Sequence, residues 1–400
     1  MNETPPPHRA LEVFLAFLVQ GLTAFGGPVA HLGYFRREFV DKRAWLSEAA
    51  FADLLALSQF LPGPASSQLG MAIGLRRAGL PGMLAAWAGF TLPAGVAMIG
   101  LAYATPYMSA AWGAGWLHGL KIAAAAVVLQ ALVAMARTLA VGPIRAGLAI
   151  GATAGLVIAQ GPVAQILALS AGALFGLLML RGEPVPDIPD DPDARTIPPA
   201  FALGALAAFA LILGLLPFLA AWLQSPTLGL ASVFYRTGAL VFGGGHVVLP
   251  LLQSEIVGRG WMAADPFLAG YGAVQALPGP LFSFAGFVGA AQTGAPGGWM
   301  GGLVALFAIF LPSLLLVVGV APFWDRLKTR AAARGAMAGV NAVVVGVLAA
   351  ALWNPVLSSS VRNLADLALV VAAFVFLAVA KLPAWLVVIG FAAATGLLLH

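Results

Sequence analysis

The chain has 400 residues, of which 61% are hydrophobic and only 9% are charged, and its formal net charge is +5. Soluble domains carry about 25% charged residues, whereas here the ranges 82–120, 196–235 and 266–324 contain no Asp, Glu, Lys or Arg. This composition excludes a soluble protein and predicts a polytopic α-helical protein in a lipid bilayer. The positive charge requires no nucleic acid, because Lys and Arg collect in short loops, as on the cytoplasmic side of membranes. The chain has no cysteine, which excludes disulfides, thiol redox chemistry and thiolate-bound metals.

The first half of the chain reads as a series of apolar segments. The polar N-terminus lacks a signal-peptide cleavage pattern, so we expect the first segment to be retained as a span. That segment, 11–33, contains Phe-Gly-Gly-Pro at 25–28, and a charged loop follows it. The next segment, 51–75, is split by Leu-Pro-Gly-Pro at 61–64 into pieces too short to span separately. The remaining predicted segments are 82–104, 117–138, 145–160 and 162–180.

A proline-rich acidic stretch, 181–199, reads as a surface linker and precedes an unaccompanied apolar helix at 200–222. A second series then mirrors the first. It comprises 230–252 with Phe-Gly-Gly-Gly at 242–245, 267–291 split by a second Leu-Pro-Gly-Pro at 277–280, and then 298–320, 335–352, 364–380 and 383–399.

The two series share landmarks in a fixed order, which predicts an internal duplication. Phe25 and Glu38 match Phe242 and Glu255 at one constant spacing. After a single deletion, Trp45, Phe51, Gln59 and Pro62 match Trp261, Phe267, Gln275 and Pro278. We therefore expect an N-terminal half at 1–180, the linker at 181–199, a connecting helix at 200–222 and a C-terminal half at 223–400.

Charge placement indicates how the halves are oriented. In the first half, cations flank the broken segment and the loop 105–115 is uncharged. In the second half, the loop equivalent to 105–115 is the basic one. The positive-inside rule then places the halves upside down to each other. The predicted fold class is an all-α polytopic membrane protein, an inverted repeat with broken or re-entrant helices and about 11–13 transmembrane segments; its absolute orientation stays open.

The paired Leu-Pro-Gly-Pro motifs are the strongest functional signal. Each proline removes a backbone N–H, and its ring clashes with the preceding turn, so neither segment can stay helical through the motif. Broken backbone at membrane depth is tolerated where it is buried in protein or lines a cavity. Matching breaks in two halves therefore indicate the binding site of a transporter.

Several longer motifs carry a family resemblance. They are FGGPVAHLGYFRREFV from 25, LPGPASSQLGMAIG from 61, FGGGHVVLPLL from 242, LPGPLFSFAGFVGA from 277 and GVNAVVVGVLAAAL at 339–352. Their combined order, over about 11–399, resembles the chromate transporter (CHR) family in its long, two-half form. The resemblance implies export of chromate, a tetrahedral dianion similar to sulfate, driven by the membrane potential or a proton gradient.

The residues around the breaks suit an oxyanion. Where a helix restarts after Pro64, the N–H groups of Ala65, Ser66 and Ser67 have no intrahelical partner and carry the positive end of the helix dipole. Serine hydroxyls add donors, and glycines let backbone N–H groups approach a ligand. The predicted substrate-binding residues are Gly26, Gly27, Pro62, Gly63, Pro64, Ser66, Ser67, Gly243, Gly244, Gly245, His246, Pro278, Gly279, Pro280 and Ser283. Close helix packing is the alternative role of the paired glycines, and a bond to the i−4 carbonyl that of the serines.

Ionisable and amide side chains form a second group of candidates for anion recruitment or coupling: Arg36, Arg37, Glu38, Glu255, Asp53, Lys121 and Asn341. The arginines alternatively set topology, the matched glutamates form interfacial salt bridges, and Asp53 is simply interfacial. Lys121 and Asn341 occupy roughly equivalent positions and could form a polar pair facing the anion. His31 and His246 adjoin the glycine motifs but do not align with each other.

Energetics favour export. Each charge moved across the membrane is worth ~2.3 kcal/mol per 100 mV, so a dianion leaving a negative interior gains roughly 4–5 kcal/mol. Uniport would suffice, and coupling to protons stays an alternative. Assembly into a homodimer also stays open. No Gly-x-x-x-x-Gly-Lys-Ser/Thr motif occurs, so we expect no ATP site and no cofactor. The alternatives are a transporter of sulfate or another tetrahedral oxyanion, a membrane-embedded enzyme, and a membrane scaffold.

Overall fold

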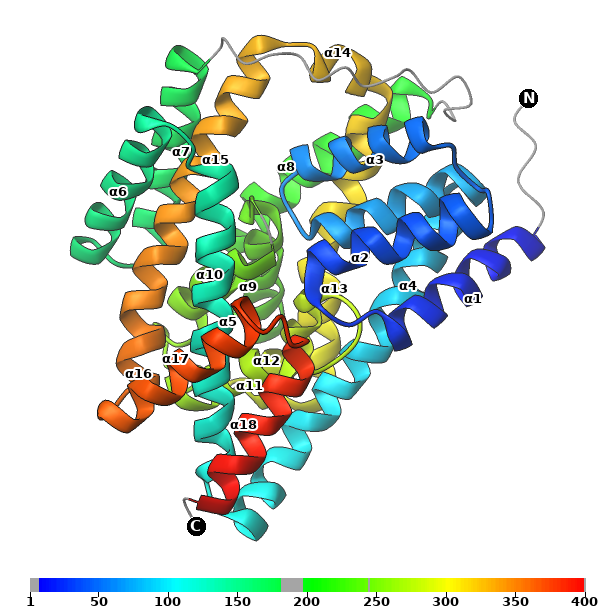
Figure 1. Cartoon of the computed structure of the whole chain (residues 1–400). Coiled ribbons are helices and arrows are strands. Elements are labelled where there is room, and N and C mark those ends of the chain that lie inside the picture. The colour runs from blue at the N-terminus through cyan, green and yellow to red at the C-terminus, as the bar shows by residue number, and fades with distance from the viewer. Residues whose placement is uncertain (1–6, 181–196, 244, 399–400) are drawn as a thin grey trace.

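The computed structural model describes residues 7–180, 197–243 and 245–398, and all regular elements in these ranges are helices (Figure 1). The first half contains α1 (Pro7–Thr23), α2 (Gly27–Arg36), the π-helix η1 (Arg37–Lys42), α3 (Glu48–Phe60), α4 (Ala65–Trp112), α5 (Gly115–Leu139), α6 (Pro143–Ile158) and α7 (Pro162–Met179). The helix α8 (Pro199–Trp222) connects it to the second half.

The second half begins with α9 (Pro226–Leu240), the 3₁₀ turn η2 (Gly245–Val247), α10 (Val248–Ile256) and α11 (Ala264–Val274). It continues through the 3₁₀ turn η3 (Leu281–Ser283), α12 (Phe284–Ala291), α13 (Gly298–Val320), the 3₁₀ turn η4 (Ala321–Phe323) and α14 (Trp324–Lys328). It ends with α15 (Ala331–Ala351), the π-helix η5 (Leu352–Leu357), α16 (Ser358–Ser360), α17 (Leu364–Ala378) and α18 (Ala384–Leu398).

The all-α membrane fold class is confirmed. Six helices among the described residues are long and apolar enough to cross a membrane, and four further apolar helices are shorter. The expected 11–13 segments therefore include helices shorter than a full span. The predicted segment 82–104 lies in the later part of α4, which is two helices joined at a kink where Ala78 and Gly79 leave helical geometry. Residues 181–196 of the predicted linker lie outside the described residues.

Local signals explain where several helices begin. The Ser47 hydroxyl accepts a hydrogen bond from the Ala50 amide at 3.1 Å and caps α3. Ser225 caps α9 in the same way through the Leu228 amide at 3.3 Å, with proline in the first helical turn. Such caps satisfy N–H groups that the first turn of a helix leaves without partners.

The leading helices of each half pack in the same way. In the first half α1 packs against α4, and in the second half α9 packs against α13. Both crossings depend on glycine. A Cβ on Gly21 would lie 2.9 Å from the Phe90 carbonyl oxygen, and a Cβ on Gly238 would collide with the Ile309 carbonyl. The duplication seen in the sequence is thus a duplication of helix packing.

The trailing helices are exchanged between the halves. The helix α5 packs against α17 and α18 of the second half, and α15 packs against α6 and α7 of the first. Glycine again allows close approach. A Cβ on Gly119 would collide with the Phe391 carbonyl, and a Cβ on Gly339 would collide with the Gly172 carbonyl. Neither half could bury these surfaces alone.

The two halves run in opposite directions. In Figure 1, α4 descends to the bottom of the view and α5 returns upward, whereas α13 ascends and α15 returns downward. This antiparallel arrangement of equivalent helices confirms the inverted repeat. It also places α3 and α14 toward the top of the view and α11 toward the bottom.

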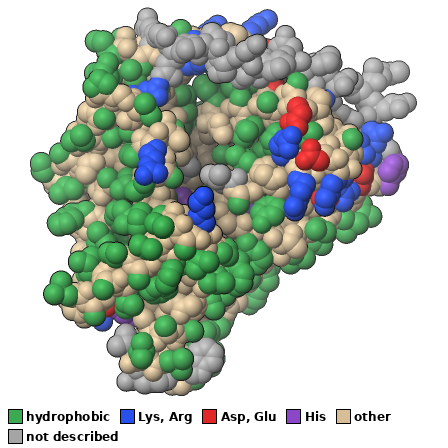
Figure 2. Space-filling view, viewed as in Figure 1, with side chains coloured by type: hydrophobic (Ala, Val, Ile, Leu, Met, Phe, Trp, Pro, Cys, Tyr) green, Lys and Arg blue, Asp and Glu red, His purple; other side chains and the backbone are tan. Residues whose placement is uncertain are grey.

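The surface is that of a membrane protein. Figure 2 shows hydrophobic side chains over the lower and left parts of one face, with charged side chains toward the top and right. The connecting helix α8 is the clearest case, because only 6% of its most apolar window is buried inside the protein. Its exposed residues include Phe218 and Trp222. Such a face is stable where lipid covers it.

Candidate functional site

The two Leu-Pro-Gly-Pro motifs break their helices as expected. In the first half α3 ends at Phe60 and α4 begins at Ala65; in the second half α11 ends at Val274, and 3₁₀ and α-helical geometry resume at 281. The glycines have φ of +127° at Gly63 and +98° at Gly279, a region that other residues rarely occupy. A Cβ on Gly63 would also collide with the Ser313 hydroxyl.

Each break is held by the backbone of the other half. The Gly63 amide donates to the Val241 carbonyl at 2.7 Å, and the Gly279 amide donates to the Ala24 carbonyl at 3.0 Å. Ala24 and Val241 are equivalent residues, because each directly precedes its Phe-Gly-Gly motif. The breaks and the glycine motifs of both halves therefore form one reciprocal assembly. The same bonds commit these two glycine amides to protein partners.

The helix restart in the first half retains the expected donors. The first hydrogen bond into α4 runs from the Gln68 amide to the Pro64 carbonyl at 2.9 Å. The N–H groups of Ala65, Ser66 and Ser67 precede that bond and have no intrahelical partner. They lie at the positive end of α4. In the second half, the Ser283 backbone amide donates to the Pro280 carbonyl at 3.0 Å, so the restart is a tight 3₁₀ turn.

The predicted serines divide into two kinds. His31, fully buried, lies 3.2 Å from the Ala24 carbonyl oxygen through Nε2 and 3.3 Å from Ser66 Oγ through Nδ1. Because a carbonyl only accepts, Nε2 carries the hydrogen and Ser66 donates to Nδ1. The Ser66 hydroxyl hydrogen is thus committed to His31, which ties the first glycine motif to the start of α4.

Ser67 and Ser283, in contrast, are equivalent residues with uncommitted hydroxyls. Each is the seventh residue counted from the leucine of its Leu-Pro-Gly-Pro motif. Their side chains are 2% and 0% exposed, and neither Oγ has a hydrogen-bond partner in the part of the chain that the structure describes. A buried hydroxyl without a partner costs about 1–3 kcal/mol and needs an explanation such as a bound ligand or ion.

Three further buried polar side chains were not predicted, and two of them, Gln68 and Ser313, lie at the first break. Gln68 is fully buried and donates through Nε2 to the Pro62 carbonyl at 2.6 Å and to Ser313 Oγ, on α13 of the second half, at 3.2 Å. Thr91, also fully buried, has a hydroxyl without a partner among the described residues. Polar side chains inside charge-free apolar segments are the signal that could have identified Gln68, Thr91 and Ser313.

The glycine motifs lie where the halves meet. A Cβ on Gly245 would be 3.4 Å from Pro28 of the first half and 3.3 Å from Leu281, which follows the second Leu-Pro-Gly-Pro. A Cβ on Gly27 would have nothing within 4 Å, although its φ is +74°. Close helix packing therefore does not account for Gly27. Gly26 has a φ of +102° and caps α2, and Gly244 lies outside the described residues.

His246 joins its motif to the second broken helix. Its Nδ1 lies 2.7 Å from the hydroxyl of Tyr271 on α11. His31 and His246 do not align in sequence, yet each links the glycine motif of its half to the broken helix of the same half. His31 contacts α4, which follows the first break, and His246 contacts α11, which precedes the second break.

The matched glutamates lie in ion pairs away from the breaks. Glu38 bonds Arg43 at 2.8 Å, and Glu255 bonds Arg259 at 2.8 Å and also pairs with Arg236. Arg43 also stacks on the ring of Trp45 at 5.3 Å, and Arg259 stacks on the ring of Trp261 at 5.5 Å. The Glu-Arg-Trp group is thus itself repeated, which favours the structural alternative over coupling.

The remaining arginine candidates also have local partners. Arg36 pairs with Glu48 and with Asp41, the latter at 3.4 Å. Arg37 lies over the Tyr34 ring at 5.8 Å. Both arginines are exposed, and none of these contacts involves a residue of the breaks.

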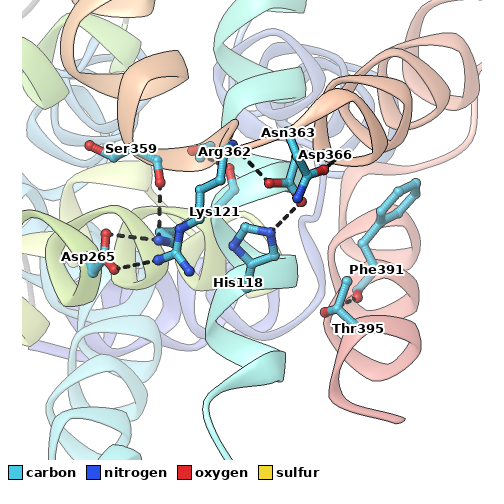
Figure 3. A network of polar contacts seen from close by, with 10 residues as sticks. His118, Lys121, Asp265, Ser359, Arg362, Asn363, Asp366, Phe391 and Thr395 are labelled. Atoms are coloured by element: carbon cyan, nitrogen blue, oxygen red, sulfur yellow. Dashed lines mark hydrogen bonds and ion pairs between the residues drawn. The ribbon is translucent and has the colours of Figure 1, made fainter. Parts of the chain in front are cut away.

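Lys121 is the centre of a polar network (Figure 3). It is 2% exposed, and its Nζ lies 2.8 Å from Asp265 Oδ1 and 3.2 Å from the Ser359 carbonyl oxygen. Arg362 approaches the other oxygen of Asp265 at 3.3 Å and donates its amide to Asp366, which His118 Nε2 meets at 2.7 Å. The network joins α5 of the first half to α11 and α17 of the second.

Asp53 lies at the opposite end of the molecule, whereas Asn341 lies halfway along α15. Asp53 on α3 accepts from Trp324 Nε1 at 2.9 Å and from Lys328 Nζ at 3.2 Å. Asn341 on α15 lies with its Oδ1 3.4 Å from the Cβ position of Gly243. Lys121 pairs with Asp265, whereas Asn341 Oδ1 is buried without a hydrogen-bond partner among the described residues, so the structure does not bring the two together as a pair. Among the residues described, no three His, Asp or Glu side chains are grouped to hold a metal ion.

The sequence profile of the family described as Chromate transporter matches residues 11–177 and 228–397, which is both halves. The "Chromate transport protein" of Pseudomonas aeruginosa is 32% identical over 360 residues, covering 86% of this chain and 80% of that protein. The protein of the same name in Cupriavidus metallidurans is 27% identical over 354 residues, covering 87% and 83%. The "Probable chromate transport protein" of Synechococcus elongatus is 28% identical over 353 residues, covering 87% and 84%. No solved structure matches the chain.

Proposed function

Because the chain belongs to the chromate transporter family, we propose that it is a secondary transporter that exports chromate across the cytoplasmic membrane of a bacterial-type cell. Sulfate or another tetrahedral oxyanion is the alternative cargo, since size and charge hardly differ. The relatives with which it shares most of its length are named as transport proteins. A membrane-embedded enzyme is therefore not our proposal.

One observation carries the proposal: the reciprocal breaks bring uncommitted donors to equivalent places in both halves. The hydroxyls of Ser67 and Ser283 are buried without partners among the described residues. The amides at the start of α4 add further donors. Hydrogen bonds to a charged acceptor are about twice as strong as neutral ones. A dianion is thus the ligand that these groups would bind most strongly.

The membrane potential supplies the driving force. Moving two negative charges out of a cell at ~100 mV releases roughly 4–5 kcal/mol. Uniport would therefore suffice for export. The proposal needs neither a coupled proton nor a second copy of the chain, so both remain open additions to it.

The test uses sealed inside-out vesicles that contain the protein, where cellular export becomes uptake. A lumen made positive should drive accumulation of labelled chromate, and competition with sulfate and molybdate should rank the cargoes. Replacing both Pro62 and Pro278 by Ala should leave the protein in the membrane and abolish uptake. The matched control is Pro217→Ala in α8, a proline inside a helix away from the breaks. Unchanged uptake by the Pro62→Ala/Pro278→Ala variant would contradict the broken-helix mechanism.

A further inference from the structure

Lys381 lies at the tip of a helical hairpin formed by α17 and α18. Each of these helices has 15 residues and is about 22 Å long, which is shorter than the ~30 Å hydrocarbon core of a bilayer. The hairpin begins and ends at the first turns of α5. Asp366 at the start of α17 meets His118, and Thr395 near the end of α18 lies against Gly119 (Figure 3).

The tip of this hairpin lies at the middle depth of the membrane. Gln130 of α5 donates to the carbonyl of Leu377, in the last turn of α17, at 3.3 Å. Twelve residues of α5 separate Gln130 from His118, which is a rise of about 18 Å along the helix. In Figure 1 the connection between α17 and α18 turns back about halfway up the molecule. An ionisable residue at this depth is a functional candidate, because a charge that faces lipid there is costly.

The hairpin tip adjoins the first glycine motif. Trp385, four residues after Lys381, has its ring centre 6.0 Å from that of Phe25, which directly precedes Gly26 and Gly27. A Cβ on Gly27 would have nothing within 4 Å, so the space beside it is open. Figure 2 shows a hollow between the two parts of the molecule, with a Lys or Arg side chain at its lower edge. The hairpin therefore brings a cation close to the candidate site.

The charge of Lys381 has no counter-charge in the part of the chain that the structure describes. Its side chain is exposed and makes no ion pair or hydrogen bond there. Every Asp and Glu among the described residues pairs with a different basic side chain. An unpaired cation at this depth requires water or an anion around it.

The backbone at Lys381 does not explain the choice of lysine. Its φ is +54°, in the left-handed region, and the Leu382 amide folds back to the Phe376 carbonyl at 2.9 Å to end α17. Glycine is the usual residue at such a helix end. A residue held in this conformation at a cost is typical of functional sites. The lysine side chain is therefore present for a contact that the described residues do not supply.

The equivalent hairpin of the first half, formed by α6 and α7, has no charge at its tip. Gln160 is the equivalent of Lys381, because each lies two residues before a proline, Pro162 and Pro383, at the start of the second helix. Gln160 lines a cavity of about 450 Å³ beside Pro250 of α10, which follows the second glycine motif. Each hairpin tip thus lies near the glycine motif of the other half, and only one tip is charged.

We propose that Lys381 is the fixed counter-charge of the transported oxyanion, which its ammonium group binds beside the first glycine motif at the middle of the membrane. This inference rests on the proposed function for the identity of the ion. Serine hydroxyls and backbone amides supply hydrogen bonds but no full charge, whereas an ammonium group adds three donors and one positive charge. The dianion therefore crosses the centre of the bilayer with part of its charge neutralised. Because Lys381 has no acidic partner among the described residues, the ion displaces none.

The first experiment measures transport kinetics in inside-out vesicles. Lys381→Met keeps the aliphatic stem and should raise the KM for chromate about tenfold or more, because a hydrogen bond from a charged donor is lost. Lys381→Arg keeps the charge and should retain most of the affinity. Neither variant should lower the Tm, since the side chain has no partner to lose among the described residues. The matched control is Arg330→Met, which removes an exposed cation from the loop before α15 and should leave the KM unchanged. An unchanged KM in Lys381→Met, or an equal rise in Lys381→Arg, would overturn the proposal.

The second experiment measures binding without transport. The chain has no cysteine, so the thiol in Leu382→Cys is unique and lies next to the intact Lys381. A water-soluble methanethiosulfonate reagent should label this thiol, and molybdate, a tetrahedral dianion that does not oxidise thiols, should slow the labelling. Lys381→Met in the same protein should remove the protection, and Gln160→Cys at the equivalent tip should be labelled without protection. A Leu382→Cys thiol that reacts only with a lipid-soluble maleimide would place the tip in lipid and overturn the proposal.

Together the two experiments separate this inference from the proposed function. If molybdate protects Leu382→Cys only when Lys381 is present, while wild-type vesicles transport no oxyanion, the proposed function fails and the ion site stands. If wild-type vesicles transport chromate, and Lys381→Met changes neither the KM nor the protection, the ion site fails and the function stands.

Discussion

Lys121 in α5 lies 2.8 Å from Asp265 at the start of α11, so a cation of the first half holds the broken helix of the second. The reverse also occurs, because Lys328 in α14 of the second half lies 3.2 Å from Asp53 in α3. The two pairs are not equivalent in sequence. Each nevertheless joins one half to the leading piece of the broken helix in the other, at opposite ends of the molecule (Figure 1).

The first prediction concerns the unequal burial of Lys121 and Asp265. The lysine side chain is 2% exposed and that of the aspartate 54%. Asp265→Asn leaves a buried ammonium with the Ser359 carbonyl, whereas Lys121→Met leaves a carboxylate that is partly solvated and still paired with Arg362. Removing one partner of a buried pair is costlier than removing both. In thermal melts of purified protein, Asp265→Asn should lower the Tm more than Lys121→Met, and the double variant should recover part of the loss. Equal losses that simply add would contradict this account.

The second prediction separates the two kinds of serine. Ser67→Ala and Ser283→Ala remove hydroxyls without partners among the described residues, so neither should lower the Tm, and each should raise it slightly. Transport by each variant should fall by about tenfold, because a hydrogen bond to a charged ligand is lost. Ser66→Ala is the control. It breaks the bond to His31 and should lower the Tm. Wild-type transport rates in Ser67→Ala/Ser283→Ala would remove these hydroxyls from the site.

The third prediction compares the two break glycines. Both have positive φ, so alanine at either position should destabilise by about 1–3 kcal/mol. At Gly63 the added Cβ would also collide with the Ser313 hydroxyl, whereas at Gly279 its closest neighbour is the Ala94 methyl group at 3.1 Å. Gly63→Ala should therefore unfold at a lower temperature than Gly279→Ala. Restored stability in Gly63→Ala/Ser313→Ala would confirm the collision with Ser313, and no restoration would assign the loss to φ and to the second collision, with Gln68 Nε2.

Local chemistry made the breaks predictable, because Pro62 and Pro278 cannot continue a helix wherever they occur. Matched landmarks likewise revealed the duplication, and charge placement revealed the inversion. The partners of the breaks were not predictable. Nothing in the residues around Gly63 indicates that its amide meets the Val241 carbonyl, since that contact joins segments far apart in the chain.

The same limit applies to side chains whose role depends on the exchanged packing. Gln68 reaches Ser313 only because α13 of the second half lies beside the first break. The sequence paired Lys121 with Asn341 by their equivalent positions, but in the folded protein Lys121 pairs with Asp265, whereas Asn341 lies beside Gly243. Equivalent positions in an inverted repeat share a local environment, whereas functional contacts form between the repeats.

The last prediction distinguishes a structural Glu38 from a proton-coupling one. Partial burial raises the pKa of this carboxyl, but the hydrogen bonds and charges of Arg43 and Lys42 outweigh that effect and hold the pKa below its ordinary value of 4.5. A group whose pKa is lower in the folded protein stabilises the fold above its unfolded pKa, and this contribution is lost as the pH falls through the folded value. Below about pH 4.5 the wild type should therefore lose stability more steeply than Glu38→Gln, in thermal melts recorded across a pH series. Near neutral pH the carboxylate stays ionised, so the pH dependence of transport should be the same in both proteins. A pH dependence of transport that disappears in Glu38→Gln would instead make Glu38 the carrier of a coupled proton.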